Sequence, residues 1–148
     1  MSNHEQLNNV LKNYFNFTQL RPGQELAIIS ALQGQDIIVI MPTGGGKSLC
    51  FQLPALIFPG ITMVISPLIA LMKDQVDHLN ALNIPATFIN SSLTAEEASE
   101  RLKEALNKKY RLLYIAPERF YNQSFFKAVQ QLPISLIAVD EAHCISQW

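Results

Sequence analysis

The sequence predicts an α/β fold in which a parallel sheet is flanked by helices. Its 148 residues, 49% apolar and 16% charged, match one globular domain and exclude a disordered chain or a coiled coil. Short apolar runs alternate along the chain with amphipathic segments, and no internal repeat or low-complexity tract interrupts them. That alternation is typical of strands that are separated by helices.

The expected strands are short, rich in isoleucine and valine, and mostly continuous rather than alternating. Strands that are buried on both faces have this pattern, which indicates a parallel sheet covered by helices. They span Ile37–Met41, Ile61–Ser66, Ala86–Ile89, Arg111–Ile115 and Ile134–Val139.

Amphipathic helices are expected between these strands. From Leu68 to Leu82 an apolar stripe includes Leu71, Met72 and Leu79 at helical spacing. Thr94 and Glu97 form a capping-box pattern that predicts the start of the next helix. On that helix, the residues expected to face inward are Ala98, Leu102, Ala105 and Leu106. We interpret both stripes as core.

Charge and cysteine content restrict the possible partners and compartment. Eleven basic and twelve acidic side chains give a formal charge of −1, so any contact with nucleic acid must be local. Cys50 and Cys144 lie far apart without zinc-site spacing, and the N-terminus lacks signal-peptide features. The segment from Ser48 to Met72 is uncharged, but the Pro59-Gly60 turn divides it, so we expect buried core. We therefore expect a cytoplasmic protein without a membrane anchor.

A phosphate-binding loop is predicted at Met41-Pro42-Thr43-Gly44-Gly45-Gly46-Lys47-Ser48, between an expected strand and helix. Its glycines allow backbone N–H groups to surround a phosphate, with no Cβ in the way. Lys47 would supply positive charge to the β- and γ-phosphates, and the Ser48 hydroxyl would ligate Mg²⁺. The pattern departs from the general motif at its first position, where Met41 replaces glycine.

Two carboxylates follow the last apolar run, at the strand end where open α/β sheets bind ligands. A charge delivered by a buried strand is costly unless it is paired or binds a metal. Asp140 would hold the Mg²⁺ that Ser48 also ligates, and Glu141 would deprotonate the water that attacks the γ-phosphate. Alone, the pair could also be an ordinary strand-end turn.

Together these motifs resemble those of the RecQ-type ATP-dependent DNA helicases of superfamily two. The resemblance spans about Phe17 to Trp148, and its most distinctive segments are MPTGGGKS and the final Asp140-Glu141-Ala142-His143-Cys144-Ile145-Ser146-Gln147-Trp148. It implies a P-loop NTPase (RecA-like) sheet, ATP and Mg²⁺ as cofactors, and DNA with single-stranded or duplex-junction structure as partner. A location at the bacterial nucleoid would follow.

The resemblance also assigns roles to further residues. Leu20-Arg21-Pro22-Gly23-Gln24 resembles an adenine-recognition motif, in which Gln24 would bind the adenine edge while Arg21 and Phe17 stack on it. The residues alone also allow a turn before a helix. The segments that start at Ser66 and at Ile115, the second including Arg119, resemble loops that lie along single-stranded DNA. Arg119 could equally be a structural ion-pair partner.

His143 and Trp148 have two interpretations. The resemblance implies that His143 relays between the ATP and DNA sites and that Trp148 opens a loop that senses bases. Each could instead be an ordinary packed residue.

In this resemblance the chain is the first part of a motor domain and stops before its sheet is complete. Residues 1–35 would form N-terminal helices with the adenine motif, and residues 36–148 the P-loop core. We expect a motor fragment for 3′-to-5′ translocation and unwinding that is inactive by itself, because the second motor domain and its arginine finger are absent. The alternatives are a truncated, non-catalytic nucleotide-binding module, or a superfamily-two translocase acting on RNA or chromatin.

Overall fold

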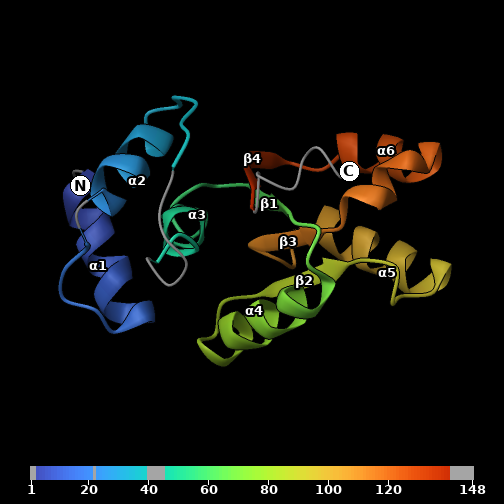
Figure 1. The fold of residues 1–148 in the computed structure, drawn as a ribbon, viewed down its shortest axis with the longest axis horizontal. Coiled ribbons are helices and arrows are strands. Elements are labelled where there is room, and N and C mark those ends of the chain that lie inside the picture. The colour runs from blue at the N-terminus through green and yellow to red at the C-terminus, as the bar shows by residue number, and fades with distance from the viewer. Residues whose placement is uncertain (1–2, 22, 40–45, 141–148) are drawn as a thin grey trace. The chain divides into compact units, whose positions relative to one another are not determined.

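The computed structural model describes residues 3–21, 23–39 and 46–140 (Figure 1). The chain divides into two compact units, Met1–Pro59 and Gly60–Trp148. Each unit has its own apolar cluster and is described separately below. The first unit extends past the predicted phosphate loop because helix α3, which follows that loop, packs with the N-terminal helices.

The first unit contains the helices α1 (Asn3–Phe15), α2 (Gln24–Leu32) and α3 (Leu49–Ala55). Helix α3 packs against both α1 and α2. Their shared core consists of five buried side chains, which are Leu7, Leu11, Ile28, Leu49 and Leu53. At about 1.5–3 kcal/mol for each large aliphatic side chain, this burial holds α3 against the N-terminal helices. It thereby fixes the residues just before α3, which are the end of the predicted phosphate loop.

The predicted strand at Ile37–Met41 is not formed in its described part. Residues 35–39 are irregular, and the Ile38 side chain is 91% exposed. Ile40 and Met41 lie outside the described residues. A strand forms only where a neighbouring strand takes up its N–H and C=O groups, and the described part of the first unit contains only helices. The apolar run alone was therefore an insufficient signal.

The second unit contains a four-stranded parallel sheet. Its strands are β1 (Ile61–Ile65), β2 (Ala86–Ile89), β3 (Leu112–Ile115) and β4 (Ile134–Val139), in the order β2-β3-β1-β4. The helical elements are α4 (Ile69–Ala81), α5 (Ala95–Leu106), the 3₁₀ turn η1 (Pro117–Tyr121) and α6 (Gln123–Gln130). Four of the predicted strands and the α/β class are thus confirmed, and Figure 1 shows helices α4, α5 and α6 around the sheet.

The helices bury somewhat different faces from those expected. Ala98 and Ala105 of α5 join the sheet core, together with Phe125 and Val129 of α6, whereas Leu106 is 50% exposed. In α4 the buried residues are Met72, Val76 and Leu79, while Leu68 and Leu71 are 37% and 46% exposed. The core stripe of α4 therefore includes Val76 and excludes Leu71.

Strand β4 is the edge of the described sheet on the side of β1. Buried residues fill β1 and β3, but in β4 half-buried residues alternate with exposed ones. Ile137 is 56% exposed and Val139 is 43% exposed. This edge is therefore unusually apolar for an exposed strand.

The long uncharged segment forms core, as expected. It divides into α3, a turn at Pro59-Gly60, β1 and the start of α4, and residues 49–55 and 61–64 are buried. Within residues 3–21, 23–39 and 46–140, no helix has the length and apolarity needed to cross a membrane.

Candidate functional site

Three residues of the predicted phosphate loop, Gly46, Lys47 and Ser48, lead directly into α3. Gly46 has a φ of 81°, in the left-handed region that favours glycine. Its carbonyl accepts from Leu49 N at 3.2 Å, and the Ser48 carbonyl accepts from Gln52 N at 2.9 Å, so the helical bonding starts here. The Ser48 side chain makes no capping hydrogen bond with α3, which leaves the hydroxyl uncommitted to the helix.

The side chain of Gln24 joins the predicted adenine motif to this loop. Its Oε1 accepts from the backbone N–H of Arg21 at 2.6 Å, and its Nε2 donates to the carbonyl of Gly46 at 3.1 Å. Gln24 is 3% exposed, so both ends of the amide are satisfied in a buried position. A Cβ on Gly46 would collide with this amide. The two motifs are therefore in direct contact within the first unit.

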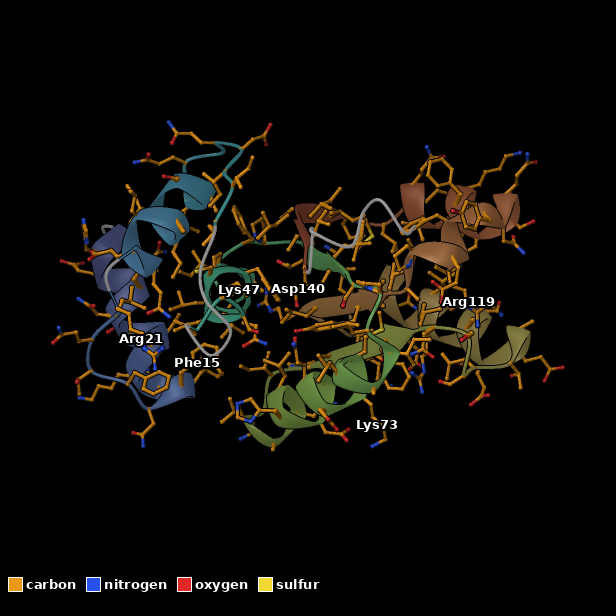
Figure 2. All side chains as sticks on the ribbon, viewed as in Figure 1. Phe15, Arg21, Lys47, Lys73, Arg119 and Asp140 are labelled. Carbon is orange, nitrogen blue, oxygen red and sulfur yellow. The ribbon has the colours of Figure 1, made fainter. Side chains whose placement is uncertain are left out.

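Phe17 and Arg21 are both exposed on the first unit, Phe17 to 54%. Figure 2 labels Arg21. An exposed aromatic ring and a guanidinium group are suited to stacking on a planar base. Gln24 Nε2 and Oε1 are the donor and acceptor that adenine recognition requires, but here they bind backbone groups.

Cys50 follows Lys47 and Ser48 in the first turn of α3. It is 8% exposed, and burial raises the pKa of its thiol. The thiol is therefore protonated at neutral pH and is a weak nucleophile. Cys50 is therefore a small, unreactive residue of the core.

In the second unit, the candidate residues directly follow the strands at the carboxyl end of the sheet. The last residues of these strands are paired with one another. Ile65 pairs with both Ile115 and Val139, and Ile115 also pairs with Ile89. The residues that follow the strands extend the hydrogen bonding between neighbouring strands by one more residue. Ser66 N donates to Ile115 O at 3.2 Å, Ala116 N to Ile89 O at 3.1 Å, and Asp140 N to Ile65 O at 2.9 Å. Residues 66, 90, 116 and 140 therefore lie side by side.

Each strand in this row ends with a different local structure. Ser66 is 5% exposed, and its Oγ accepts from Leu68 N at 3.3 Å, which starts the turn into α4. Pro117 begins the turn η1 after β3. Asp140 directly follows β4 and is half-buried. This edge is the place where parallel α/β sheets bind ligands.

Arg119, labelled in Figure 2, contacts the loop that follows β2. Its Nη2 donates to Asn90 O at 2.5 Å and to Leu93 O at 3.0 Å, and its Nε donates to Asn90 O at 3.2 Å. These partners are backbone carbonyls rather than the carboxylate of an ion pair.

Asn90 is a member of this edge that the sequence analysis missed. It is 1% exposed, and its Oδ1 accepts from Ser92 N at 2.9 Å and from Ser92 Oγ at 2.5 Å. Its signal in the sequence was available, because a polar residue follows the apolar run Ala86–Ile89 just as Ser66 follows Ile61–Ile65.

Several predicted residues lie outside the described part of the chain. They are Thr43, Gly44, Gly45, Glu141, His143 and Trp148. Lys47 and Ser48 belong to the first unit and Asp140 to the second. The convergence of Lys47, Asp140 and Glu141 on one triphosphate therefore stays a prediction.

Comparison with known proteins identifies what the chain is similar to. Residues 21–148 match the family described as DEAD/DEAH box helicase. ATP-dependent DNA helicase RecQ of Haemophilus influenzae is 52% identical over 139 residues, which cover 94% of this chain and 22% of that protein. RecQ of Bacillus subtilis is 49% identical, with 94% of this chain and 24% of that protein covered. The mouse ATP-dependent DNA helicase Q5 is 48% identical, with 93% and 15% covered.

A solved structure supports the fold. The helicase MrfA, in a crystal structure with DNA and AMPPNP, superposes with a TM-score of 0.72 over 97% of this chain and 22% of that one, at 21% identity. At this identity the likeness concerns the fold, which is the RecA-like α/β fold of helicase motor domains. The chain spans about a fifth of the length of the RecQ relatives.

Proposed function

Since this chain belongs to the DEAD/DEAH box helicase family, we propose that it is the first part of an ATP-dependent DNA helicase motor. Its residues would bind ATP, and hydrolysis would be coupled in the full-length protein to 3′-to-5′ movement along DNA and to unwinding. The observation that carries the proposal is the contact of Gln24 Nε2 with the Gly46 carbonyl, 3.1 Å long. It joins a candidate base-recognition residue to a phosphate-loop residue although 22 positions separate them.

In the proposed nucleotide site, the residues of the first unit would bind the ATP and orient its base and phosphates. Lys47 would contact the β- and γ-phosphates, and backbone N–H groups from Thr43 to Gly46 would surround them. Gln24 would exchange its backbone partners for the adenine edge, while Phe17 and Arg21 stack on the base. Phe17 is exposed enough to do so.

We further propose that Ser48 and Asp140 would hold a magnesium ion. The Ser48 hydroxyl is not used in capping α3, and Asp140 ends a strand at the ligand-binding edge of the sheet. Hydroxyl and carboxylate oxygens are the ligands that Mg²⁺ prefers. When bound, the ion would neutralise charge on the phosphates. Glu141 would accept the proton of the attacking water.

We assign the DNA contacts to the carboxyl edge of the sheet in the second unit. Ser66 and the η1 turn start there, next to one another through the pairing of β1 with β3. His143 and Trp148 would couple the nucleotide to the DNA. The formal charge of −1 supports a local contact surface rather than a general basic one. The protein would act in the cytoplasm, at the nucleoid.

Lys47→Ala and Glu141→Gln in the full-length protein test this function. We expect both to abolish DNA-stimulated phosphate release, a loss of at least about 10³-fold, because each removes a group required for γ-phosphate transfer. Glu141→Gln should keep ATP affinity near the parent value, and Lys47→Ala should weaken it. The measurements are phosphate release with single-stranded DNA and binding of a fluorescent ATP analogue.

Glu96→Gln is the matched control, because it removes one carboxylate by the same type of substitution but lies on α5. It should leave turnover unchanged. Turnover by Glu141→Gln at the parent rate would contradict the role of Glu141, whereas a parent protein that binds ATP without hydrolysing it would support the non-catalytic module instead. Stimulation by RNA but not by DNA would contradict the assigned substrate.

A further inference from the structure

We propose that Ser135 is a positioning residue that sets the register of β4 and thereby places the Asp140 carboxylate for Mg²⁺. Ser135 itself would contact neither the ion nor the nucleotide. The inference rests on the proposed function and adds to it a residue at the opposite end of β4, which the sequence analysis treated only as part of a strand.

The first argument is that β4 contains one residue more than its pairing with β1 requires. Ile61 lies opposite Ile134. The next residue of β1, Thr62, lies opposite Leu136, so Ser135 has no counterpart in β1. Such an extra residue is a β-bulge, and it shifts the register of every residue that follows it in the strand.

The second argument is what this shift does to Asp140. Beyond the bulge, Ile65 lies opposite Val139, and its carbonyl accepts from Asp140 N at 2.9 Å. Without the bulge, Ala138 would lie opposite Ile65, and Val139 would take the place that Asp140 has now. A shift of one residue would also turn each side chain to the other face of the sheet. The bulge therefore decides where the Asp140 carboxylate lies.

The third argument is the set of contacts that hold the bulge. Ser135 Oγ accepts from the backbone N–H of Gly60 at 2.9 Å. Beside it, the Pro133 carbonyl accepts from Ile61 N at 2.8 Å. A Cβ on Gly60 would overlap both Pro133 O and Ser135 Oγ, so glycine is what allows this close approach. The start of β4 is thus fixed to the start of β1 through the hydroxyl as well as through the backbone.

The fourth argument is the composition of β4. Ser135 is the one polar residue of this strand, and it is exposed. Exposure alone does not explain the serine, because Ile137 and Val139 of the same strand are also exposed and apolar. Apolar β-branched residues suit strands better than serine does. The hydrogen bond with Gly60 gives the hydroxyl a use that an apolar side chain could not supply.

Ser135→Val and Ser135→Thr in the full-length protein test the role of the hydroxyl. The two new side chains have nearly the same shape and both suit a strand, but only threonine keeps the hydroxyl. The measurement is the affinity for a fluorescent ATP analogue, once with Mg²⁺ and once with EDTA. We expect Ser135→Val to lose about fivefold in affinity with Mg²⁺, the effect of one hydrogen bond, and nothing with EDTA. Ser135→Thr should match the parent in both.

Ser99→Val is the matched control, because it makes the same substitution at an exposed serine of α5. It should leave both affinities at the parent values. A purely structural role of Ser135 would lower the two affinities of Ser135→Val equally, since a less stable protein binds less nucleotide with or without the ion. That result overturns the proposal.

Hydrogen exchange tests the register itself and needs no nucleotide. The Asp140 amide is held by the Ile65 carbonyl, so it should exchange faster in Ser135→Val than in Ser135→Thr. Gly60→Ala disturbs the bulge from the side of β1 and should have the same effect, which keeps the test decisive if Ser135→Val does not fold. Exchange of this amide at the parent rate in every variant that folds contradicts the inference.

The outcomes separate this inference from the proposed function. A parent protein that binds ATP more tightly with Mg²⁺, and a Ser135→Val variant that keeps the full effect of the ion, would sink the inference and leave the proposed function standing. A parent that binds no ATP would end both.

Discussion

The geometry around Gly46 in the first unit leaves no room for a side chain. Its φ is 81°, and a Cβ there would overlap the amide nitrogen of Gln24. Two independent requirements, a left-handed backbone and close approach of a buried amide, therefore select glycine at this position. Predicting a phosphate loop from the sequence explained the backbone requirement, but not the contact with Gln24.

We expect Gly46→Ala to weaken ATP binding by tenfold or more, on the order of 1.4 kcal/mol. The new methyl group would displace the Gln24 side chain from its place beside the loop, from which it is proposed to reach the adenine edge. Isothermal titration with ATP in the presence of Mg²⁺ measures the effect.

Gly34→Ala provides the matched control for this substitution. Gly34 has a nearly equal φ of 78°, but a Cβ there meets nothing within 4 Å. Both variants should lose about 1–2 kcal/mol of folding free energy to left-handed strain. Only Gly46→Ala should lose ATP affinity, and equal ATP affinities of the two variants would count against the role of Gln24.

At the scale of elements, helix α5 shows the closest agreement between sequence and structure. The capping box predicted from Thr94 and Glu97 is present with both of its hydrogen bonds. Thr94→Ala should cost about 1 kcal/mol of stability. The hydrogen bond from the Thr94 backbone N–H lowers the pKa of Glu97 below its usual value of 4.5, with a further contribution from the Thr94 side chain.

This lowered pKa predicts how stability depends on pH. The stabilisation from ionised Glu97 is complete above pH 4.5 and is lost as the pH falls through the lower pKa of the folded state. Glu97→Gln should remove this part of the acid dependence. Urea unfolding between about pH 5 and pH 2 measures it, since carboxyl groups titrate in that range.

Glu96→Gln serves as the control because Glu96 lies in the same first turn but outside the capping box. It should keep the acid dependence of the parent protein. Identical acid profiles for Glu97→Gln and the parent would show that the capping box does not contribute.

Strands and loops were predictable to different degrees, for physical reasons. Ile61–Ile65 and Ile134–Val139 were predicted almost to the residue because both are short, continuous and mostly apolar runs, although only the first is a buried strand. Ile37–Val39 has the same composition but forms no strand, since strand formation depends on a partner that composition does not reveal. The bond of Arg119 to Asn90 joins residues 29 positions apart, and it follows from tertiary packing alone.

At the scale of the whole molecule, the exposed edge of β4 has a consequence for association. Ile137 and Val139 are exposed on a strand that, among the described residues, pairs only with β1. Exposed apolar edge strands tend to pair with other chains. We expect residues 1–148, produced alone, to self-associate through β4.

Ile137→Lys should raise the concentration at which association begins by about tenfold, because a lysine on an edge strand opposes pairing. Sedimentation velocity over a concentration series measures this. Leu106→Lys is the control, since Leu106 is similarly exposed, at 50%, but lies on a helix. If both variants associate like the parent, the edge of β4 is not the contact.

The row of residues 66, 90, 116 and 140, which follow the four strands, also bears on how such a protein can change over evolution. The backbone N–H groups of Ser66, Ala116 and Asp140 donate the last hydrogen bonds between neighbouring strands. These bonds mark the boundary between positions inside the sheet and positions beyond its carboxyl end. Before them, a substitution alters the packing of the sheet and therefore whether the chain folds. Beyond them, insertions and exchanges alter what the edge touches while the sheet keeps its register. Ligand preference can therefore change beyond this edge while the fold of the sheet stays the same.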